Sequence, residues 1–266
     1  MSAAPVPDRL VRYLVAAVPC HGLDRGDHLA RLSAAPWNGG RATGERDDPA
    51  SPRLAPCEPT KIVCIGLNYL EHVKESLTVA PGASAPPAEP LFFFKPPSAV
   101  LAPGQPIVKP SGLVRLDPEG EVALVIGRRA RRVSEAEALA HVAGVTAFND
   151  VSARDWQKQD SQWSRAKGSD TFAPFGPCVT LGLDPRDLAF ELSVNGETRQ
   201  RARTSDMHFG PAFLVHWVSR FVTLEPGDVI ATGTPAGIAP IEPGDEVAVS
   251  VEGVGTLVNR VVMESA

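Results

Sequence analysis

Apolar residues in this chain recur mainly in short runs separated by turn residues. Residues 122–126 form an uninterrupted apolar run, and residues 144–148 form a second one. Short apolar runs bounded by turns are typical of buried strands. Further strands are expected at 61–66 and 91–95. The pattern therefore predicts a protein built largely from strands.

Helical periodicity is confined to a few segments. Residues 213–221 carry apolar side chains at helical spacing, and 67–76 is expected to be a short helix. Ser134 and Glu137 have the spacing of a capping box and predict a helix over 134–142. Because helices and strands do not alternate regularly, neither a doubly wound sheet nor an eight-fold barrel is expected. We predict an α+β fold that is mostly β with few helices.

The first 58 residues differ in composition from the rest of the chain. Short strands are expected at 10–15 and 28–32, whereas 37–59 is dense in Gly, Pro, Asp and Arg, which is the composition of loops. The sequence thus predicts a small β-rich N-terminal module and linker, 1–58, followed by a larger domain, 59–266. The module has too few apolar residues for a core of its own, so we expect it to pack on the larger domain.

Turn signals punctuate the remaining segments. Asn195 and Gly196 predict a hairpin with an Asn-Gly turn. The sequence Glu-Pro-Gly-Asp occurs at 225–228 and again at 242–245, which predicts two similar β-turns. Residues 77–90 contain four prolines among small residues and are expected to form a flexible or extended loop.

Composition limits the classes of function. The 266 residues are 43% hydrophobic and 21% charged, which is ordinary for a globular protein with a real core. The net charge of −5 and the lack of a long Lys/Arg block do not favour nucleic acid or an anionic membrane surface as partners. No signal peptide and no apolar run of about 20 residues are evident. Cys20, Cys57, Cys64 and Cys178 have neither zinc-site nor CxxC spacing, so we expect reduced thiols in a cytoplasmic protein.

Candidate chemistry begins with Glu119 and Glu121, which precede the apolar run 122–126. Because side chains alternate along a strand, both glutamates point to the same side. Two acids there repel each other unless a cation neutralises them. A Glu-x-Glu pair alone more often lines a solvated strand edge. Asp150 adds a third carboxylate, however, at the end of the apolar stretch 144–148.

Three carboxylates around one divalent cation leave a net charge of about −1 and fill part of a shell of roughly six oxygens. Water and the carboxylate and keto oxygens of a 2-oxo acid can fill the remaining positions. Mg²⁺ or Mn²⁺ suits an all-oxygen set better than Zn²⁺, which favours His and Cys. We therefore predict a metal site on Glu119, Glu121 and Asp150.

Groups that bind anions follow Asp150. Arg154 and Gln157 lie four and seven residues after it, on the same face if the segment is helical. Arginine supplies a planar fork for a carboxylate or enolate, and glutamine supplies a neutral donor. Lys167 is flanked by aromatic residues and followed by Gly168, which allows a partly enclosed ammonium near the metal. For each residue alone, the alternative is an exposed polar side chain.

His72 and Glu75 are three residues apart, hence on one face of a helical turn. A carboxylate can orient an imidazole so that it takes a proton from water; the alternative is a surface pair without function. Residues 231–237 form a loop of small residues whose backbone N–H groups and threonine hydroxyls can hold an anion, unless the loop is only a tight turn. It lacks the GK[ST] ending of a phosphate loop, so nucleotide binding is the weaker alternative.

Taken together and in this order, these segments resemble the fumarylacetoacetate hydrolase family. The similarity spans about 60–262 and includes seven separate places: Ile65-Gly66-Leu67-Asn68-Tyr69 with His72 and Glu75, Phe93-Phe94-Lys95-Pro96, Glu119-Gly120-Glu121, Asn149 to Asp155, Ala166-Lys167-Gly168, Val194-Asn195-Gly196 and Thr232 to Gly237. The chain is most similar to the shorter bacterial members, which are described as acylpyruvate hydrolases or as isomerases and decarboxylases of the homoprotocatechuate pathway. Pro118, residues 207–211 and residues 1–58 depart from the family pattern, which bears on the substrate more than on the metal.

The resemblance implies a fold of rolled, layered β-sheets and usually a homodimer. It implies Mg²⁺ or Mn²⁺ on Glu119, Glu121 and Asp150. It further implies that Thr234, in the loop 231–237, contacts the carboxylate of the substrate.

The resemblance also implies catalytic roles. His72 and Glu75 would form a pair that activates water. Lys167, with Arg154 and Gln157, would lie near the negative charge that develops during the reaction.

The expected function is metal-dependent hydrolysis of a C–C bond in a 2,4-dioxo acid of the acylpyruvate or fumarylpyruvate type. Two alternatives use the same metal site: decarboxylation of the oxaloacetate type, and isomerisation of the 2-hydroxyhepta-2,4-diene-1,7-dioate type. An alternative of another class is a non-catalytic binding protein that retains the fold. The presence of all the candidate groups argues against this last alternative.

Overall fold

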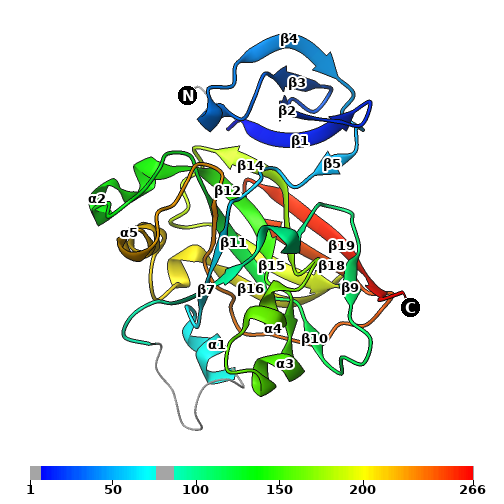
Figure 1. The fold of residues 1–266 in the computed structure, drawn as a ribbon, viewed down its shortest axis with the longest axis vertical. Coiled ribbons are helices and arrows are strands. Elements are labelled where there is room, and N and C mark those ends of the chain that lie inside the picture. Colours follow the sequence, from blue (N-terminus) through cyan, green and yellow to red (C-terminus); the bar gives the residue numbers. More distant parts are fainter. Residues whose placement is uncertain (1–6, 76–86, 266) are drawn as a thin grey trace.

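The structure, a computed structural model, describes residues 7–75 and 87–265. Most of the loop predicted at 77–90 lies outside these residues. Strands make up 42% of the structure and helices 18%, so the prediction of a mostly β fold with few helices is confirmed. The sheets are open and do not close into a barrel (Figure 1).

One long sheet runs through the molecule (Figure 1). In spatial order, its strands within the described chain are β4 (Ala42–Asp47), β3 (Leu29–Leu32), β2 (Val18–Asp24), β1 (Arg9–Val15), β14 (Ala173–Leu181), β12 (Val142–Asn149), β11 (Gly120–Ile126), β17 (Val229–Ala231), β6 (Ile62–Gly66) and β7 (Leu91–Lys95), with β5 (Arg53–Leu54) beside β1 and β8 (Val100–Leu101) beside β14. The strands predicted at 61–66, 91–95, 122–126 and 144–148 are all present.

A second, smaller sheet packs against the middle of the long one. Its strands in spatial order are β16 (Glu197–Arg203), β15 (Ala189–Val194), β18 (Glu246–Val251), β19 (Gly255–Met263) and β9 (Ile107–Lys109). Leu192 and Val249 from this sheet share one buried core with Val122 and Leu124 of β11. A separate short ladder joins β10 (Leu116–Asp117) to β13 (Ser152–Ala153).

The helices of the described chain are short, apart from the last. They are α1 (Leu70–Glu75), α2 (Glu135–Ala138), α3 (Arg154–Gln159), α4 (Ser164–Gly168) and α5 (Pro211–Phe221), with 3-10 turns η1 (Pro36–Asn38), η2 (Pro97–Ala99), η3 (Leu139–His141) and η4 (Thr204–Asp206). The helix predicted over 134–142 forms as α2 continued by η3. The predicted capping box is wrong, because the Ser134 hydroxyl donates to the Glu137 carboxylate (2.7 Å) and makes no side-chain bond to the backbone.

The N-terminal strands β1–β5 lie at one end of the molecule, at the top of Figure 1. They continue the long sheet, because Arg9 and Leu10 of β1 pair with β14. The loop predicted at 37–59 is wrong in part, since β4 and β5 lie within it. β4 has a polar sequence because it is an exposed edge strand, and its last residue, Asp47, binds Tyr13 and Arg31. The division of the chain at residue 58 stays a prediction.

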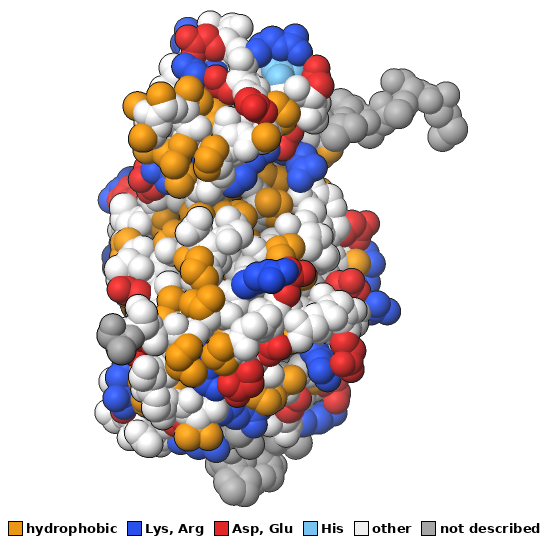
Figure 2. All heavy atoms as spheres, turned by 90° about the vertical axis from the view of Figure 1, so that its right-hand side faces the viewer, with side chains coloured by type: hydrophobic (Ala, Val, Ile, Leu, Met, Phe, Trp, Pro, Cys, Tyr) orange, Lys and Arg blue, Asp and Glu red, His pale blue; other side chains and the backbone are white. Residues whose placement is uncertain are grey.

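The surface carries both signs of charge. On the face shown in Figure 2, basic and acidic side chains are interspersed and hydrophobic ones are scattered between them. Such a distribution agrees with the small net charge of −5. Within residues 7–75 and 87–265, no helix has the length and apolar character needed to cross a membrane.

The predicted turns are present. Asn195 and Gly196 both have positive φ, 52° and 80°, as a tight hairpin turn between β15 and β16 requires. In each Glu-Pro-Gly-Asp turn, the aspartate carboxylate accepts a bond from the N–H of the glutamate, 2.7 Å for Asp228 and 2.7 Å for Asp245. Asp228 is fully buried and also accepts bonds from Thr60 and from Lys61, which anchors the start of β6.

This difference between two similar turns predicts different costs of removing the aspartate. Asp228→Ala should lower the free energy of unfolding by about 3 kcal/mol, because Thr60 and Lys61 lose a buried acceptor. Asp245→Ala, the matched control, removes a partly exposed acceptor and should cost about 1 kcal/mol. Urea denaturation of the two variants measures the difference, and equal losses would contradict this account of the buried carboxylate.

Candidate metal centre and active site

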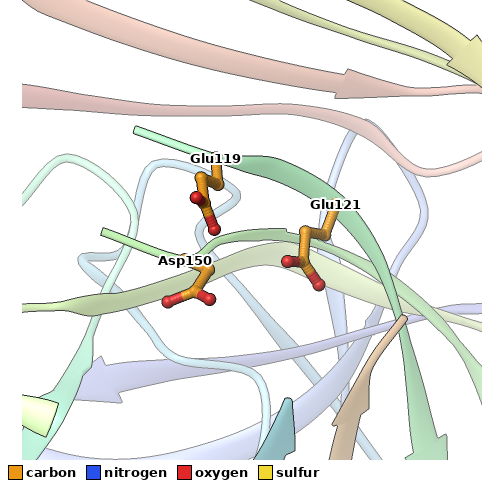
Figure 3. A group of neighbouring side chains, drawn as sticks. All are labelled: Glu119, Glu121 and Asp150. Carbon is orange, nitrogen blue, oxygen red and sulfur yellow. The ribbon is translucent and has the colours of Figure 1, made fainter. Parts of the chain in front are cut away.

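The three predicted metal ligands converge on one point (Figure 3). Glu119 directly precedes β11, Glu121 is its second residue, and Asp150 directly follows β12. One carboxylate oxygen of each residue lies within 4.8 Å of the others. None of the three residues is more than 4% exposed, so water cannot offset their mutual repulsion.

The register of the central strands explains this convergence. Gly120 of β11 lies opposite Asn149 of β12, and the Asp150 N–H donates to the Glu119 carbonyl (2.8 Å). Glu119 and Asp150 are therefore neighbours across two strands. Glu121 joins them because side chains two apart lie on one face of a strand.

Three buried cations surround two of the acids. Lys167 Nζ donates to Glu119 (2.7 Å) and to Asp150 (2.8 Å). Lys95 Nζ lies 2.7 Å from the other oxygen of Asp150. Arg154 binds the second oxygen of Glu119. Both of these carboxylates thus have cationic partners on both oxygens.

Glu121 differs from the other two acids. Its protein partner is a backbone N–H, that of Gly233, at 2.8 Å. Burial raises the pKa of Glu121 well above its ordinary value, and the charges of Asp150 and Glu119 raise it further. Burial alone would also raise the pKa of Glu119, but Lys167 and Arg154 outweigh it and hold that pKa below its ordinary value.

The donor set therefore fits a hard divalent cation. All three ligands offer carboxylate oxygens, the type that Mg²⁺ and Mn²⁺ prefer. The raised pKa of Glu121 identifies the position where positive charge is missing. A dication bound there neutralises the one acid that the protein itself leaves without a cationic partner.

Arg154 and Gln157, at the start and middle of α3, line the same cavity as predicted for substrate contacts. Arg154 donates to Asp117 (2.9 Å), to the Gln157 side-chain oxygen (2.8 Å) and to Glu119. Gln157 thus uses its oxygen on Arg154, which leaves its NH₂ group to donate to a ligand.

His72 and Glu75 both lie on α1, as predicted. His72 Nδ1 is buried, makes no hydrogen bond within the described structure, and lies 3.6 Å from Glu75, too far for one. The Glu75 carboxylate accepts from the N–H of Gly237 (3.0 Å), so it ties α1 to the loop that follows β17. Burial would raise the pKa of Glu75, but His72 and the N–H groups of Gly237 and Ile238 lower it, which keeps this carboxylate ionised.

Thr234 lies in that loop and lines the cavity. Its hydroxyl donates to the Gly120 carbonyl (3.0 Å) and accepts from Gln200 (2.8 Å). Because a hydroxyl has one hydrogen, the Thr234 hydroxyl has none left to donate to a carboxylate. The N–H groups of Thr232, Gly233 and Gly237 are also bonded within the protein, and Pro235 has no N–H, so the backbone N–H of Thr234 is the better candidate.

Sequence reasoning missed three residues that position this site. Lys95 was noticed only as part of a family motif; it is fully buried and donates to the carbonyls of Val151 (3.2 Å) and Phe172 (2.8 Å). The alternation of side chains along β7 is the signal that could have placed Lys95 at the site. Side chains two apart share a face of a strand, so Lys95 lies on the same face as Phe93, which lines the cavity.

Asp117 and Gln200 are the other two. Asp117 is fully buried and accepts hydrogen bonds from Arg115 and Arg154. The second of these bonds holds Arg154 against Glu119. Gln200 accepts from the Gly120 N–H (2.8 Å) and so joins β16 to the start of β11. Gln200 stands between two arginines of β16 that are exposed. Because side chains alternate along a strand, the sequence could have indicated that Gln200 points inward.

The space at the centre of the cavity is small, about 20 Å³, enough for one water molecule or one ion. One wall is apolar and includes Ile65, Leu67, Phe93 and Trp163. Leu67 has a φ of 60°, a region that costs a bulky residue roughly 1 kcal/mol or more. Asn68 holds this bend through bonds to the backbone at Thr232 and Phe209.

Comparison with known proteins adds a family. A family model described as fumarylacetoacetate (FAA) hydrolase C-terminal matches residues 61–262. A protein of Mycobacterium tuberculosis is 47% identical over 212 residues, which cover 79% of this chain and 78% of that protein. A mitochondrial oxaloacetate tautomerase of Bos taurus is 41% identical over 222 residues, covering 79% and 69%. The crystal structure of a 2-hydroxyhepta-2,4-diene-1,7-dioate isomerase from Mycobacterium marinum has a TM-score of 0.88 at 40% identity, covering 97% of this chain and 100% of that one.

The raised pKa of Glu121 predicts a pH-dependent stability of the metal-free protein. The folded protein holds the proton of the Glu121 carboxyl more tightly than the unfolded chain does. The protonated carboxyl therefore contributes fully to the free energy of unfolding below the ordinary glutamate pKa of about 4.5. This contribution falls as pH rises, by at most about 1.4 kcal/mol per pH unit. Glu121→Gln removes this loss. Without metal, the variant should match the wild type at pH 5 and exceed its stability at pH 8 by more than about 1 kcal/mol.

Thermal and urea unfolding in EDTA measure this difference. Added Mg²⁺ or Mn²⁺ should stabilise the wild type, by about 2.7 kcal/mol at 100 times the Kd, and should not stabilise Glu121→Gln. A variant that is less stable than the wild type at pH 8 would contradict the assignment of an uncompensated charge to Glu121.

Proposed function

The chain belongs to the fumarylacetoacetate hydrolase family, and we propose that it is a divalent-metal-dependent hydrolase that cleaves a C–C bond in a 2,4-dioxo acid of the acylpyruvate or fumarylpyruvate type. The observation that carries the proposal is the combination of a buried acidic triad with a buried imidazole, His72, whose Nδ1 has no hydrogen-bond partner in the described structure. A metal site alone suits many reactions. A buried imidazole beside it suits a reaction that begins by removing a proton from water.

Glu119, Glu121 and Asp150 are the proposed ligands of Mg²⁺ or Mn²⁺. When bound, such an ion acts as a Lewis acid toward the keto and carboxylate oxygens of a 2-oxo acid. The backbone N–H of Thr234 and the Gln157 NH₂ group are the proposed donors to the substrate carboxylate. The metal and these donors would together hold the 2-oxo acid end of the substrate in the deepest part of the cavity.

In the proposed reaction, His72 takes a proton from water, and the oxygen adds to the carbonyl carbon of the acyl group. The bond between this carbon and the neighbouring CH₂ then breaks, and its electron pair forms the enolate of pyruvate. The proton held by His72 returns to that CH₂ carbon. The products are a carboxylic acid and pyruvate, so one water is consumed and the histidine is regenerated.

Glu75 and Lys167 have supporting roles in this scheme. Glu75 is ionised and stabilises His72 once it carries the proton. Lys167 keeps its positive charge, because burial lowers its pKa less than Asp150 and Glu119 raise it. Its ammonium is thus a fixed donor for negative charge that develops on oxygen during the reaction.

The second candidate is isomerisation or decarboxylation on the same residues, with His72 moving a proton between carbon and oxygen and no attack by water. The observation that favours it is the set of relatives, which includes a dienedioate isomerase and an oxaloacetate tautomerase. A non-catalytic binding protein of the same fold is the third alternative. The homodimer and the cytoplasmic location stay predictions.

The role of His72 is testable by substitution. His72→Ala should lower kcat for acetylpyruvate hydrolysis by about 10²–10⁴-fold, because the base is lost. Glu75→Gln should lower it by a smaller factor. Mg²⁺ binding, measured by calorimetry, should persist in both variants. His141→Ala is the control, since His141 is only partly buried, does not line the cavity and contacts backbone carbonyls. Full hydrolysis by His72→Ala would remove the base from this scheme.

The reaction type is testable with a substrate pair. Acetylpyruvate and oxaloacetate are offered to the wild type with Mg²⁺, with Mn²⁺ and with EDTA. We expect metal-dependent release of acetate and pyruvate from acetylpyruvate, at a kcat/KM more than about tenfold above that for any turnover of oxaloacetate. Tautomerisation or decarboxylation of oxaloacetate without hydrolysis would favour the second candidate. Tight metal binding without turnover of any 2-oxo acid would favour the third.

A further inference from the structure

A second hollow adjoins the candidate active site. It has a volume of about 290 Å³ and is lined by Leu91, Phe92, Phe93, Ser161, Gln162 and Trp163. We call it the outer hollow. Strand β7 supplies three of its residues and the connection between α3 and α4 supplies the other three. Phe93 and Trp163 line both the outer hollow and the site that holds the triad.

The two aromatic rings that line both spaces contact each other, and one of them contacts Lys167. Phe93 and Trp163 pack edge to face, with centroids 5.4 Å apart. The other neighbour of the Phe93 ring is the ammonium of Lys167, at 5.3 Å from the centroid. Both rings border the two spaces, so a chain that extends from the triad past Lys167 would reach the outer hollow along them.

Among the residues that the structure describes, none that lines the outer hollow is charged, unlike those of the inner site. Its lining offers four apolar side chains, one hydroxyl and one amide. On the neighbouring helices, Arg165 is already bound to Asp160 at 2.7 Å and stacked on Trp156 at 4.7 Å. A carboxylate in the outer hollow would face four apolar side chains and would gain no cationic partner from this lining.

We propose that the outer hollow binds the acyl group of the substrate and selects neutral, apolar acyl groups over those that end in a carboxylate. This rests on the proposed function for the location of the 2-oxo acid end at the triad. It names the substrate class within that function: acylpyruvates with an aliphatic or aromatic acyl group, ahead of fumarylpyruvate and the dienedioates. Phe93 and Trp163 are the specificity-determining residues.

Binding without turnover tests this inference independently of hydrolysis. Calorimetry in Mg²⁺ compares 2-oxobutanoate, 2-oxohexanoate and 2-oxooctanoate with the diacid 2-oxohexanedioate. Affinity should rise up to about fourfold for each methylene that the hollow buries. The diacid should bind at least tenfold more weakly than its 6-methyl ester, which keeps the first carboxylate and has an uncharged far end. Equal affinities along the series, or tighter binding of the diacid, would overturn the inference.

A matched pair of variants locates the selectivity. Gln162→Arg places a cation in the outer hollow, and should raise the ratio of diacid to methyl-ester affinity by about tenfold or more. Ser164→Arg adds the same charge to an exposed residue of α4 outside the hollow, and should leave that ratio unchanged. The same change of ratio in both variants would mean that long-range charge, and not the hollow, sets the preference. Trp163→Ala should flatten the dependence on chain length.

The outcomes for the two proposals are separable. If affinity rises with chain length but no acylpyruvate is hydrolysed, the proposed reaction fails and the assignment of the outer hollow stands. If acylpyruvates are hydrolysed with equal kcat/KM for acetyl, hexanoyl and carboxylate-ended acyl groups, the reaction stands and the outer hollow has no role in specificity.

Discussion

The antiparallel pairing of β11 with β12 is the constraint on which the site depends. A slip of one residue in this register would turn Glu121 to the other face and separate it from Asp150. Gly120 allows the required approach, because a Cβ there would lie 2.8 Å from Leu192 on the second sheet. Gln200 then fixes the same residue through its N–H. The two sheets thus meet at the one residue that separates the two glutamates, which explains why the acids are held so rigidly.

Burying three acids together lowers stability, and the surrounding residues limit this cost unequally. Lys95, Lys167 and Arg154 neutralise Glu119 and Asp150, and Asp117 holds the arginine in place. Glu121 is left to a single backbone donor. A full set of cations would have made the metal-free protein more stable, but it would also have removed the attraction for a dication. The site therefore gives up stability at one residue and keeps a position there that a dication would fit.

Much of the fold was predictable because its signals are local. Short apolar runs marked the central strands, and Asn195 with Gly196 marked a hairpin. Strand β4 was missed because an exposed edge strand needs no apolar alternation, so its polar sequence looked like a loop. The candidate site residues were found from types and spacing, but their partners were not, because Asp117, Lys95 and Gln200 reach the site through contacts distant in sequence. The outer hollow could not be predicted at all, since β7 and the segment between α3 and α4 are far apart along the chain.

The bond between Glu75 and Gly237 has a consequence for how ligands and catalysis are linked. One carboxylate faces both the imidazole of His72 and the backbone of the loop 231–237, the proposed carboxylate site. A ligand that moved this loop would also change the contact between Glu75 and His72, and by thermodynamic reciprocity the protonation of His72 would change the affinity of the loop for that ligand. Every 2-oxo acid carries the carboxylate that this loop is proposed to hold, so even the shortest one would reach His72 indirectly, through Glu75. Ligand and proton would then be coupled through a single side chain.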